Sequence, residues 1–399
     1  MTQADHISRT SLSASATTHI VQDGLSATTS VLLPVLAQTF GLNYAQVGLL
    51  RGVKSFTQAV VEMGSGWLSE RWGECQLLAA GLALTGIGYF FMAIAPSLAV
   101  VTFGLLVVGV GTALHHAPSS ALIATNYPSG RRSSALGVYN ASGDVGKLAF
   151  SGGFSFAIGI GFAWFQVSLW YAVCAIIAAL AIVFISKEIR SLRRVTKQSE
   201  ADTAANGDLG RWGILNWRLF SMLLAAICID NMVQTSVLVF MAFLMLFKGL
   251  PLWLATGATV LLLAGGVVGK AVCGYLADRL GVRTAFTLIQ VLTALGLATI
   301  VIAPNWLALT LLIPLGAVVQ GSTSITYGFA AELIHPDRMA RGYALLYASG
   351  SFTAAAGPPL FGILADGQGI SMAIYAMAVA TLLAIPLIFM LPAKTTKAD

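Results

Sequence analysis

Long apolar runs separated by short polar loops follow one another along almost the whole chain. A helix that crosses a membrane needs about 20 apolar residues, at a rise of about 1.5 Å each. Runs of that length fall at 17–40, 44–69, 75–95, 98–124, 133–158 and 162–186, and again at 217–246, 252–276, 284–303, 306–332, 341–364 and 370–391. The pattern predicts an all-α membrane protein with twelve spans.

One long polar stretch interrupts the runs and predicts how the chain is divided. Residues 187–216 are rich in charge and contain no apolar run, so we expect a linker between two six-helix bundles. The expected parts are a tail at 1–16, a bundle at 17–186, the linker at 187–216, a bundle at 217–392 and a tail at 393–399.

Short motifs recur in the two halves. The segment "GWLSERWG" after the second run returns as "GYLADRLG" after the eighth, and "Asp23…TSVL" in the first run returns as "Asp230…TSVL" in the seventh. Internal repeats are typical of transporter folds, whose substrate site lies between the repeats near the bilayer midplane. The repeats therefore predict two pseudo-symmetric bundles with a site between them.

Composition excludes several classes of protein. The 399 residues are 57% hydrophobic and only 10% charged, with a mean hydropathy of +0.82, whereas soluble domains carry roughly 25% charged residues. The basic residues lie in short loops rather than on one face, so nucleic-acid binding is excluded. The four cysteines are far apart along the chain and form neither a zinc motif nor a disulfide framework.

The basic residues in the loops predict the orientation in the membrane. Seventeen of them fall in the loops and tails on the side of the two termini, and Lys248 alone falls on the other side. Basic loops stay in the cytoplasm. We therefore expect both termini to be cytoplasmic, in a plasma membrane of the bacterial inner-membrane type.

Charged residues also occur inside the spans, where each costs at least about 2.5–3.5 kcal/mol at mid-bilayer and so indicates a cavity or a partner. The bases are Arg51, Lys54, Lys147 and Lys270, and the acids are Asp23, Glu62, Asp144 and Asp230. Equal numbers predict mutual pairing in the empty protein. For each of them, a purely structural ion pair between helices remains the alternative.

The second span carries a polar stripe. Arg51, Lys54, Gln58 and Glu62 are spaced by three, four and four residues, which places them on one helix face. Such a stripe predicts a water-filled path, with Arg51, Lys54 and Gln58 binding substrate. Glu62 and Lys270 hold repeat-equivalent positions with opposite charge, which predicts a gate between the halves.

The fourth and fifth spans hold further candidates for substrate binding. Asn140, Asp144 and Lys147 can share one face of the fifth span. A paired acid holds its proton more tightly once the base has left, so this pair can also bind a proton. His116 precedes Pro118, which predicts a kink that frees backbone carbonyls, and we expect His116 to line the cavity.

Proton coupling is expected at His19, Asp23 and Asp230, with helix capping or packing as the alternative. His19 and Asp23 are four residues apart, and histidine titrates near neutral pH. No third ligand lies near the adjacent His115 and His116 in sequence, so no metal site is predicted. No nucleotide-binding loop or nucleophile with a base is present either. We therefore expect neither an enzyme nor a cofactor.

Over all twelve spans the chain resembles the major facilitator superfamily. Its Gly-x-x-x-Asp-Arg-x-Gly loop is matched by Gly274, Asp278, Arg279 and Gly281, and more loosely by Gly66, Glu70, Arg71 and Gly73. The segments "HIVQDG", "GVGTALHHAP" and "GILAD" are similar to the fosmidomycin-resistance-type exporters. The resemblance implies alternating access, with Glu70 and Asp278 facing a helix start in the opposite half. An acid is favourable there, so the four charged residues of the two loops are expected to act in gating.

The chain also departs from the subfamily pattern, because that pattern lacks the bases Arg51, Lys54 and Lys147. Packing of the shared fold does not require them, so they favour a substrate such as a carboxylate or a phosphonate. We expect a monomeric, proton-coupled secondary transporter of a small organic anion, whose partners are its substrate, protons and the lipid bilayer. Export is favoured by the resemblance, and uptake is the alternative. A receptor or scaffold is remote, because neither a soluble domain nor a long outer loop is present.

Overall fold

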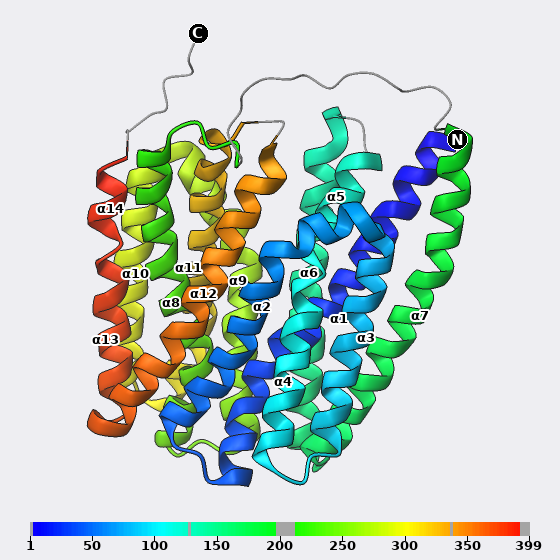
Figure 1. Ribbon diagram of the computed structural model, residues 1–399. Coiled ribbons are helices and arrows are strands. Elements are labelled where there is room, and N and C mark those ends of the chain that lie inside the picture. Colours follow the sequence, from blue (N-terminus) through cyan, green and yellow to red (C-terminus); the bar gives the residue numbers. More distant parts are fainter. Residues whose placement is uncertain (1–2, 127–128, 197–211, 336–337, 392–399) are drawn as a thin grey trace.

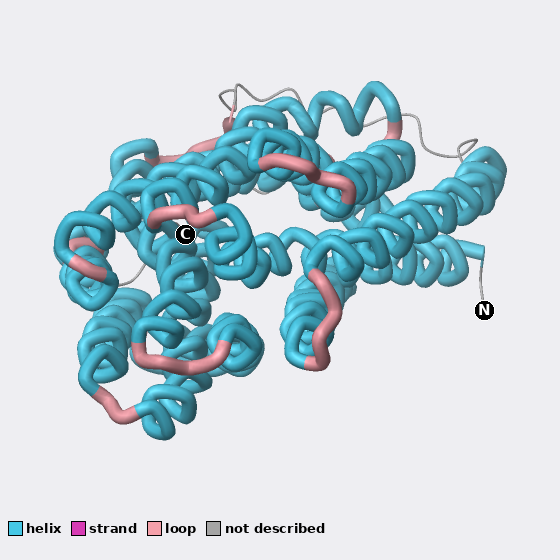
Figure 2. The backbone as a smooth tube through the Cα atoms, turned by 90° about the horizontal axis from the view of Figure 1, so that it is seen from below, coloured by secondary structure: helices cyan, strands magenta, loops and turns pink. Residues whose placement is uncertain are grey.

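The computed structural model describes residues 3–126, 129–196, 212–335 and 338–391. Within these ranges the backbone is helical apart from short connections and one isolated β-bridge between Ile214 and Ile334. Figure 1 shows the helices running side by side in two groups. The view along the bundle in Figure 2 separates the same two groups. The all-α fold in two six-span halves is as predicted.

Each half contains seven helices that make six passes. The first half comprises α1 (Gln3–Phe40), α2 (Tyr44–Trp72), α3 (Glu74–Ala93), α4 (Leu98–Ala113), α5 (His116–Asn126), α6 (Ser129–Gly159) and α7 (Trp164–Thr196). The second comprises α8 (Trp217–Phe247), α9 (Leu252–Leu280), α10 (Val282–Ile302), α11 (Asn305–Glu332), α12 (Met339–Gln368), α13 (Ile370–Leu382) and α14 (Ile385–Phe389). We call the end where α1 begins and α7 ends the terminal face, and the opposite end the distal face (Figure 1).

Proline interrupts two of the passes. The helix of the fourth span ends at Ala113 and resumes at His116, because Pro118 has no N–H to donate to the carbonyl of Leu114. This is the kink that the sequence predicted. In the last span, Pro386 accompanies the break between α13 and α14 in the same way.

Two boundaries differ from the expected ones. The first helix begins at Gln3 rather than near 17, and Ala14 packs in a small core with Leu78, Leu122 and Ile182, which holds this extension against the bundle. Helix α7 continues to Thr196, through the first part of the predicted linker. Residues 197–211 and the C-terminal tail lie outside the described ranges.

Nine of the described helical segments are long and apolar enough to cross a membrane. Helices α2, α6 and α12 are not among them. Two of these, α2 and α6, carry five of the eight charges predicted inside the spans. Both pack against the opposite half, α2 on α12 and α6 on α9. The charged helices therefore form the interface between the halves, where side chains can avoid lipid.

Glycine allows the α2–α12 interface to close tightly. Gly48 and Gly52 on α2 face backbone carbonyls of Pro358 and Ala355 on α12, and a Cβ at either glycine would collide with that backbone. The interface therefore brings the backbones of the two halves into direct contact near the distal face.

Candidate site between the two halves

A continuous series of ion pairs crosses from one half to the other. On the first-half side, the Nζ of Lys147 lies 3.1 Å from Oδ2 of Asp23 and 3.2 Å from Oδ1 of Asp144. On the other side, Nζ of Lys270 lies 2.6 Å from the same Asp144 oxygen. The series joins α1 to α6 and α6 to α9. It brings together four of the eight interior charges that were predicted from sequence.

Lys270 reaches across the halves as the gating prediction requires, but its partner is Asp144 rather than Glu62. Oε2 of Glu62 instead accepts a hydrogen bond of 2.9 Å from Ser351 on α12. The two repeat-equivalent positions thus each contact the opposite half, one through an ion pair and one through a neutral donor. Their opposite charges do not meet, because they lie on different interhelical interfaces, α2–α12 and α6–α9.

The expectation that all interior charges form ion pairs with one another is wrong for Arg51 and Lys54. Nη1 of Arg51 donates to Ser55 at 2.5 Å, and Nζ of Lys54 donates to Ser26 at 2.5 Å and to Gln58 at 3.4 Å. Among the described residues, no carboxylate forms an ion pair with either base. The Nε of Arg51 is buried without a hydrogen-bond partner, and Lys54 is only 2% exposed. In the described part of the chain these two neighbouring bases on α2 therefore form no ion pair, although Asp23 and Glu62 lie close enough to Lys54 to interact with its charge.

Two histidines and Asp23 meet beside this series. Nε2 of His19 lies 3.1 Å from Oδ2 of Asp23, and Nε2 of His116 lies 3.6 Å from Oδ1. The break in the fourth span places His116 at the start of α5, next to α1. These three residues could hold a metal ion, since their ligand atoms all lie within 4.8 Å of one another. The sequence argument against a metal site considered only ligands close along the chain, and it missed this arrangement.

Asp230, the third predicted coupling residue, lies apart from the series. It is 5% exposed, and its carboxylate accepts hydrogen bonds from Gln290 at 2.8 Å and Ser322 at 2.6 Å. Gln290 in turn accepts from Thr381 at 2.7 Å. The network links α8, α10, α11 and α13 inside the second half. Among the described residues, no base forms an ion pair with Asp230.

The remaining candidates lie at the edges of the site or at the terminal face. Asn140 is exposed on α6, one turn before Asp144. The guanidinium of Arg71 lies over the ring of Trp67 at 5.6 Å, and that of Arg279 over Tyr275 at 5.2 Å. Asp278 is exposed, and the side chain of Glu70 lies outside the described part of the structure.

The distal face is closed by polar contacts that sequence reasoning missed. The carboxylate of Asp366, at the end of α12, accepts hydrogen bonds from the backbone N–H groups of Tyr44 at 2.8 Å and Ala45 at 2.9 Å. On the other interface, the hydroxyl of Ser155 on α6 donates to the carbonyl of Trp253 on α9 at 2.9 Å. The family segment "GILAD" ends in Asp366, so its position was visible in the sequence without its role.

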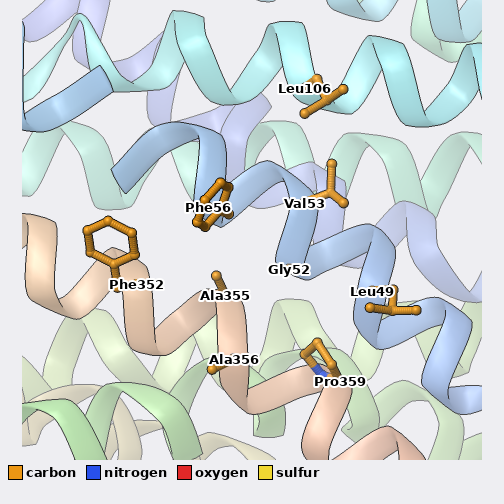
Figure 3. Close-up of a pocket in the computed structure, with 9 residues that line it drawn as sticks. All are labelled: Leu49, Gly52, Val53, Phe56, Leu106, Phe352, Ala355, Ala356 and Pro359. Atoms are coloured by element: carbon orange, nitrogen blue, oxygen red, sulfur yellow. The ribbon is translucent and has the colours of Figure 1, made fainter. Parts of the chain in front are cut away.

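Figure 3 shows the side chains that line a pocket between helices. The pocket has a volume of about 360 Å³. Its lining is apolar and comes from α2, α4 and α12: Leu49, Gly52, Val53, Phe56, Leu106, Phe352, Ala355, Ala356 and Pro359. None of the predicted site residues lines it. The charged side chains proposed to bind substrate or protons therefore lie outside this pocket, mainly on α1, α2 and α6.

Twelve passes in two halves, with buried charges between the halves, are the architecture of secondary transporters. The model of the Major Facilitator Superfamily matches residues 16–268 and 254–399. The chain therefore belongs to this superfamily, a family of multi-pass membrane transporters rather than enzymes.

Three known proteins show how far the likeness extends. An uncharacterized MFS-type transporter, YfnC of Bacillus subtilis (strain 168), is 24% identical over 94% of this chain and 90% of its own. The fosmidomycin resistance protein of Escherichia coli (strain K12) is 22% identical over 49% of this chain and 47% of its own. A bacterial homologue of the lysosomal transporter Spinster, solved in an inward-facing and unoccupied conformation, has a TM-score of 0.77 at 16% identity, covering 96% of both chains.

Proposed function

We propose that this transporter moves a small organic anion, such as a carboxylate or a phosphonate. The observation that carries the proposal is the pair of bases on α2, Arg51 and Lys54, which have only neutral partners among the described residues. A buried charge without a counter-ion is costly. A bound anion offsets that cost, because guanidinium binds an oxyanion through two parallel hydrogen bonds and ammonium acts as a point charge.

Proton coupling is proposed at Glu62 and Asp230, the two interior acids that form no ion pair with a base among the described residues. Each is held by neutral donors only: Ser351 for Glu62, and Ser322 with Gln290 for Asp230. An acid in such surroundings can gain a proton without breaking an ion pair. Glu62 also shares the α2 stripe with Lys54, so an anion that binds the bases changes the charge that Glu62 faces. Binding of the anion and of the proton are linked in this way.

The proposal also covers the direction of transport, the orientation in the membrane and the oligomeric state. Similarity to a fosmidomycin resistance protein supports export, so the protein acts as an antiporter of protons and the organic anion. The excess of basic residues in the loops of the terminal face supports a cytoplasmic position for both termini in the bacterial inner membrane. The protein works as a monomer, because the site is formed by the two halves of one chain.

The test is a transport screen in proteoliposomes with an imposed pH gradient and an internal pH dye. Carboxylates and phosphonates are compared with their neutral amides and esters. We expect the anions to be transported and the neutral analogues not to be. Arg51→Lys should weaken binding of the anion more than binding of a neutral analogue, because lysine cannot reproduce the two parallel hydrogen bonds.

One further variant and a control sharpen this test. Lys54→Gln should lower the affinity for the anion at least about tenfold, the loss expected for a charge-assisted hydrogen bond. Arg218→Gln, on an exposed base at the start of α8 that belongs to none of the expected sites, serves as the control and should leave the affinity unchanged. If Arg51→Lys and Lys54→Gln reduce binding of charged and neutral compounds equally in folded protein, the anion proposal is wrong.

A further inference from the structure

We propose that His19, Asp23 and His116 form a binding site for a divalent transition-metal ion. The site is built from α1 and α5 and lies beside the ion pairs that cross between the halves. It is distinct from the anion site proposed on α2, and its test uses metal alone. Failure of one proposal therefore leaves the other standing.

The spacing of the ligand atoms fits a metal ion. Ligands about 2.1 Å from a tetrahedral ion lie roughly 3.4 Å from one another. The two contacts to Asp23 are close to that spacing, at 3.1 Å from Nε2 of His19 and 3.6 Å from Nε2 of His116. All three ligand atoms lie within 4.8 Å of one another. A small rotation of the His116 ring therefore completes a set of three ligands.

The surroundings of His19 point its free nitrogen at the site. Nδ1 of His19 lies 2.7 Å from the backbone oxygen of Tyr139, which can only accept a hydrogen bond, so Nδ1 carries the proton. In the neutral ring, Nε2 then presents its lone pair to Asp23. Within the described structure this Nε2 is buried and makes no hydrogen bond of good geometry, and Oδ2 of Asp23 lies 3.1 Å from it. A backbone carbonyl behind the ring is the second contact that metal-binding histidines usually make.

His116 is oriented in a similar way. Its Nδ1 lies 3.5 Å from the hydroxyl of Tyr139, and its ring stacks on Tyr347 of α12 with the ring centroids 6.0 Å apart. The Nε2 atom is left to face Asp23. The side chain of His116 is 24% exposed, whereas those of His19 and Asp23 are 4% and 7% exposed. An ion therefore reaches the site from the side of His116.

In the absence of a metal ion, the ammonium group of Lys147 is the cation that contacts Asp23. Its Nζ contacts Oδ2 of Asp23 at 3.1 Å and Asp144 at 3.2 Å, and its side chain is 29% exposed. An incoming cation repels the ammonium, which can keep Asp144 as its partner while it leaves Asp23. The metal and Lys147 thus compete for one carboxylate. This competition predicts that removal of the lysine charge strengthens metal binding.

The ligand set selects the class of ion. Two imidazoles and one carboxylate suit Zn²⁺, Co²⁺ and Ni²⁺, whereas Mg²⁺ and Ca²⁺ prefer oxygen ligands throughout. Water supplies the remaining positions. Co²⁺ is the most informative probe, because its visible absorption reports both occupancy and coordination geometry.

The experiment titrates the purified full chain, without a histidine tag, with Co²⁺ in detergent and then displaces it with Zn²⁺. We expect one ion per chain. Asp23→Asn and His116→Gln should lower the affinity at least about tenfold, since even outer-shell changes cost 10–100-fold. His115→Gln is the matched control, because this neighbouring histidine lies outside the ligand set. Lys147→Gln should bind Co²⁺ more tightly than the wild type.

Several results would overturn the proposal. One is the absence of stoichiometric binding to the wild-type protein. Another is an equal loss of binding in the His115 and His116 variants, and a third is binding that survives both Asp23→Asn and His116→Gln. A Lys147→Gln protein that binds Co²⁺ no more tightly than wild type contradicts the competition. Thermal unfolding of each variant shows whether it is folded, and Asp23→Glu supplies a second change at the carboxylate that keeps a ligand.

Discussion

Lys270 on α9 lies 2.6 Å from Asp144 on α6, and this ion pair joins the two halves of the transporter. Alternating access requires the halves to move against each other. Because Asp144 also binds Lys147 at 3.2 Å, it can release Lys270 without being left unpaired. The contact is therefore suited to breaking and re-forming during transport.

Removing the acid from this pair should destabilise the protein. Asp144→Asn leaves Lys270 without a carboxylate, and we expect a loss of roughly 3 kcal/mol, the low end for a broken buried pair, because Lys270 is 32% exposed. The double variant Asp144→Asn/Lys270→Gln should lose less, since no base is then left unpaired. Thermal unfolding in detergent measures both. Additive losses would mean that the two side chains do not interact.

Asp366 should hold the distal face closed. Its carboxylate caps the start of α2 from the opposite half, and such a cap contributes about 0.5–2 kcal/mol. Asp366→Ala, which removes both acceptor oxygens, should therefore shift the equilibrium toward a distal-open state by a factor of about 2–30. The measurement is the labelling rate of a single cysteine that replaces Ser155, in a protein from which the four native cysteines have been removed. Ser155 is buried in the α6–α9 interface near the distal face.

Asp278→Asn provides a control for this measurement with the opposite sign. The loop that contains Asp278 is expected to support closure of the terminal face, so the variant should slow labelling at position 155. If Asp366→Ala and Asp278→Asn change the rate in the same direction, the role assigned to Asp366 is wrong.

The orientation in the membrane can be read from cysteine accessibility in intact cells. A cysteine placed in the 187–216 segment should not react with an impermeant maleimide, because the basic loops favour the cytoplasm. A cysteine at Lys248, the single basic loop residue of the distal face, should react. The reverse pattern would place the termini outside.

A variant at Asp230 should lose proton coupling and keep the ability to move substrate. Asp230→Asn keeps the size of the side chain and one acceptor for Ser322 or Gln290, and it removes the site for a proton. We expect transport driven by the pH gradient to fall to background, while exchange of substrate across the membrane continues. Gradient-driven transport at the wild-type rate would show that Asp230 carries no coupling proton.

The sequence by itself predicted the twelve passes, most of their approximate ends and their grouping into two halves. In lipid, each span must satisfy its own backbone hydrogen bonds, so length and hydropathy define most of the spans, nine of them by these two criteria alone among the described residues. The break before Pro118 followed from a missing N–H group. The location of the charges on α2 and α6 was also visible, because few charged residues interrupt apolar runs in a chain of this composition.

Only the tertiary structure decided which of these charges meet. Asp144 and Lys270 are 126 residues apart, and the repeat suggested Glu62 for Lys270 instead. The outcome depends on how each helix is rotated about its axis and on which helix of the other half it packs against. Neither is encoded in periodicity along one span. For the same reason, His19 and Asp23 met His116 although no local spacing joined them, and Arg51 and Lys54 remained without an acid in the described structure.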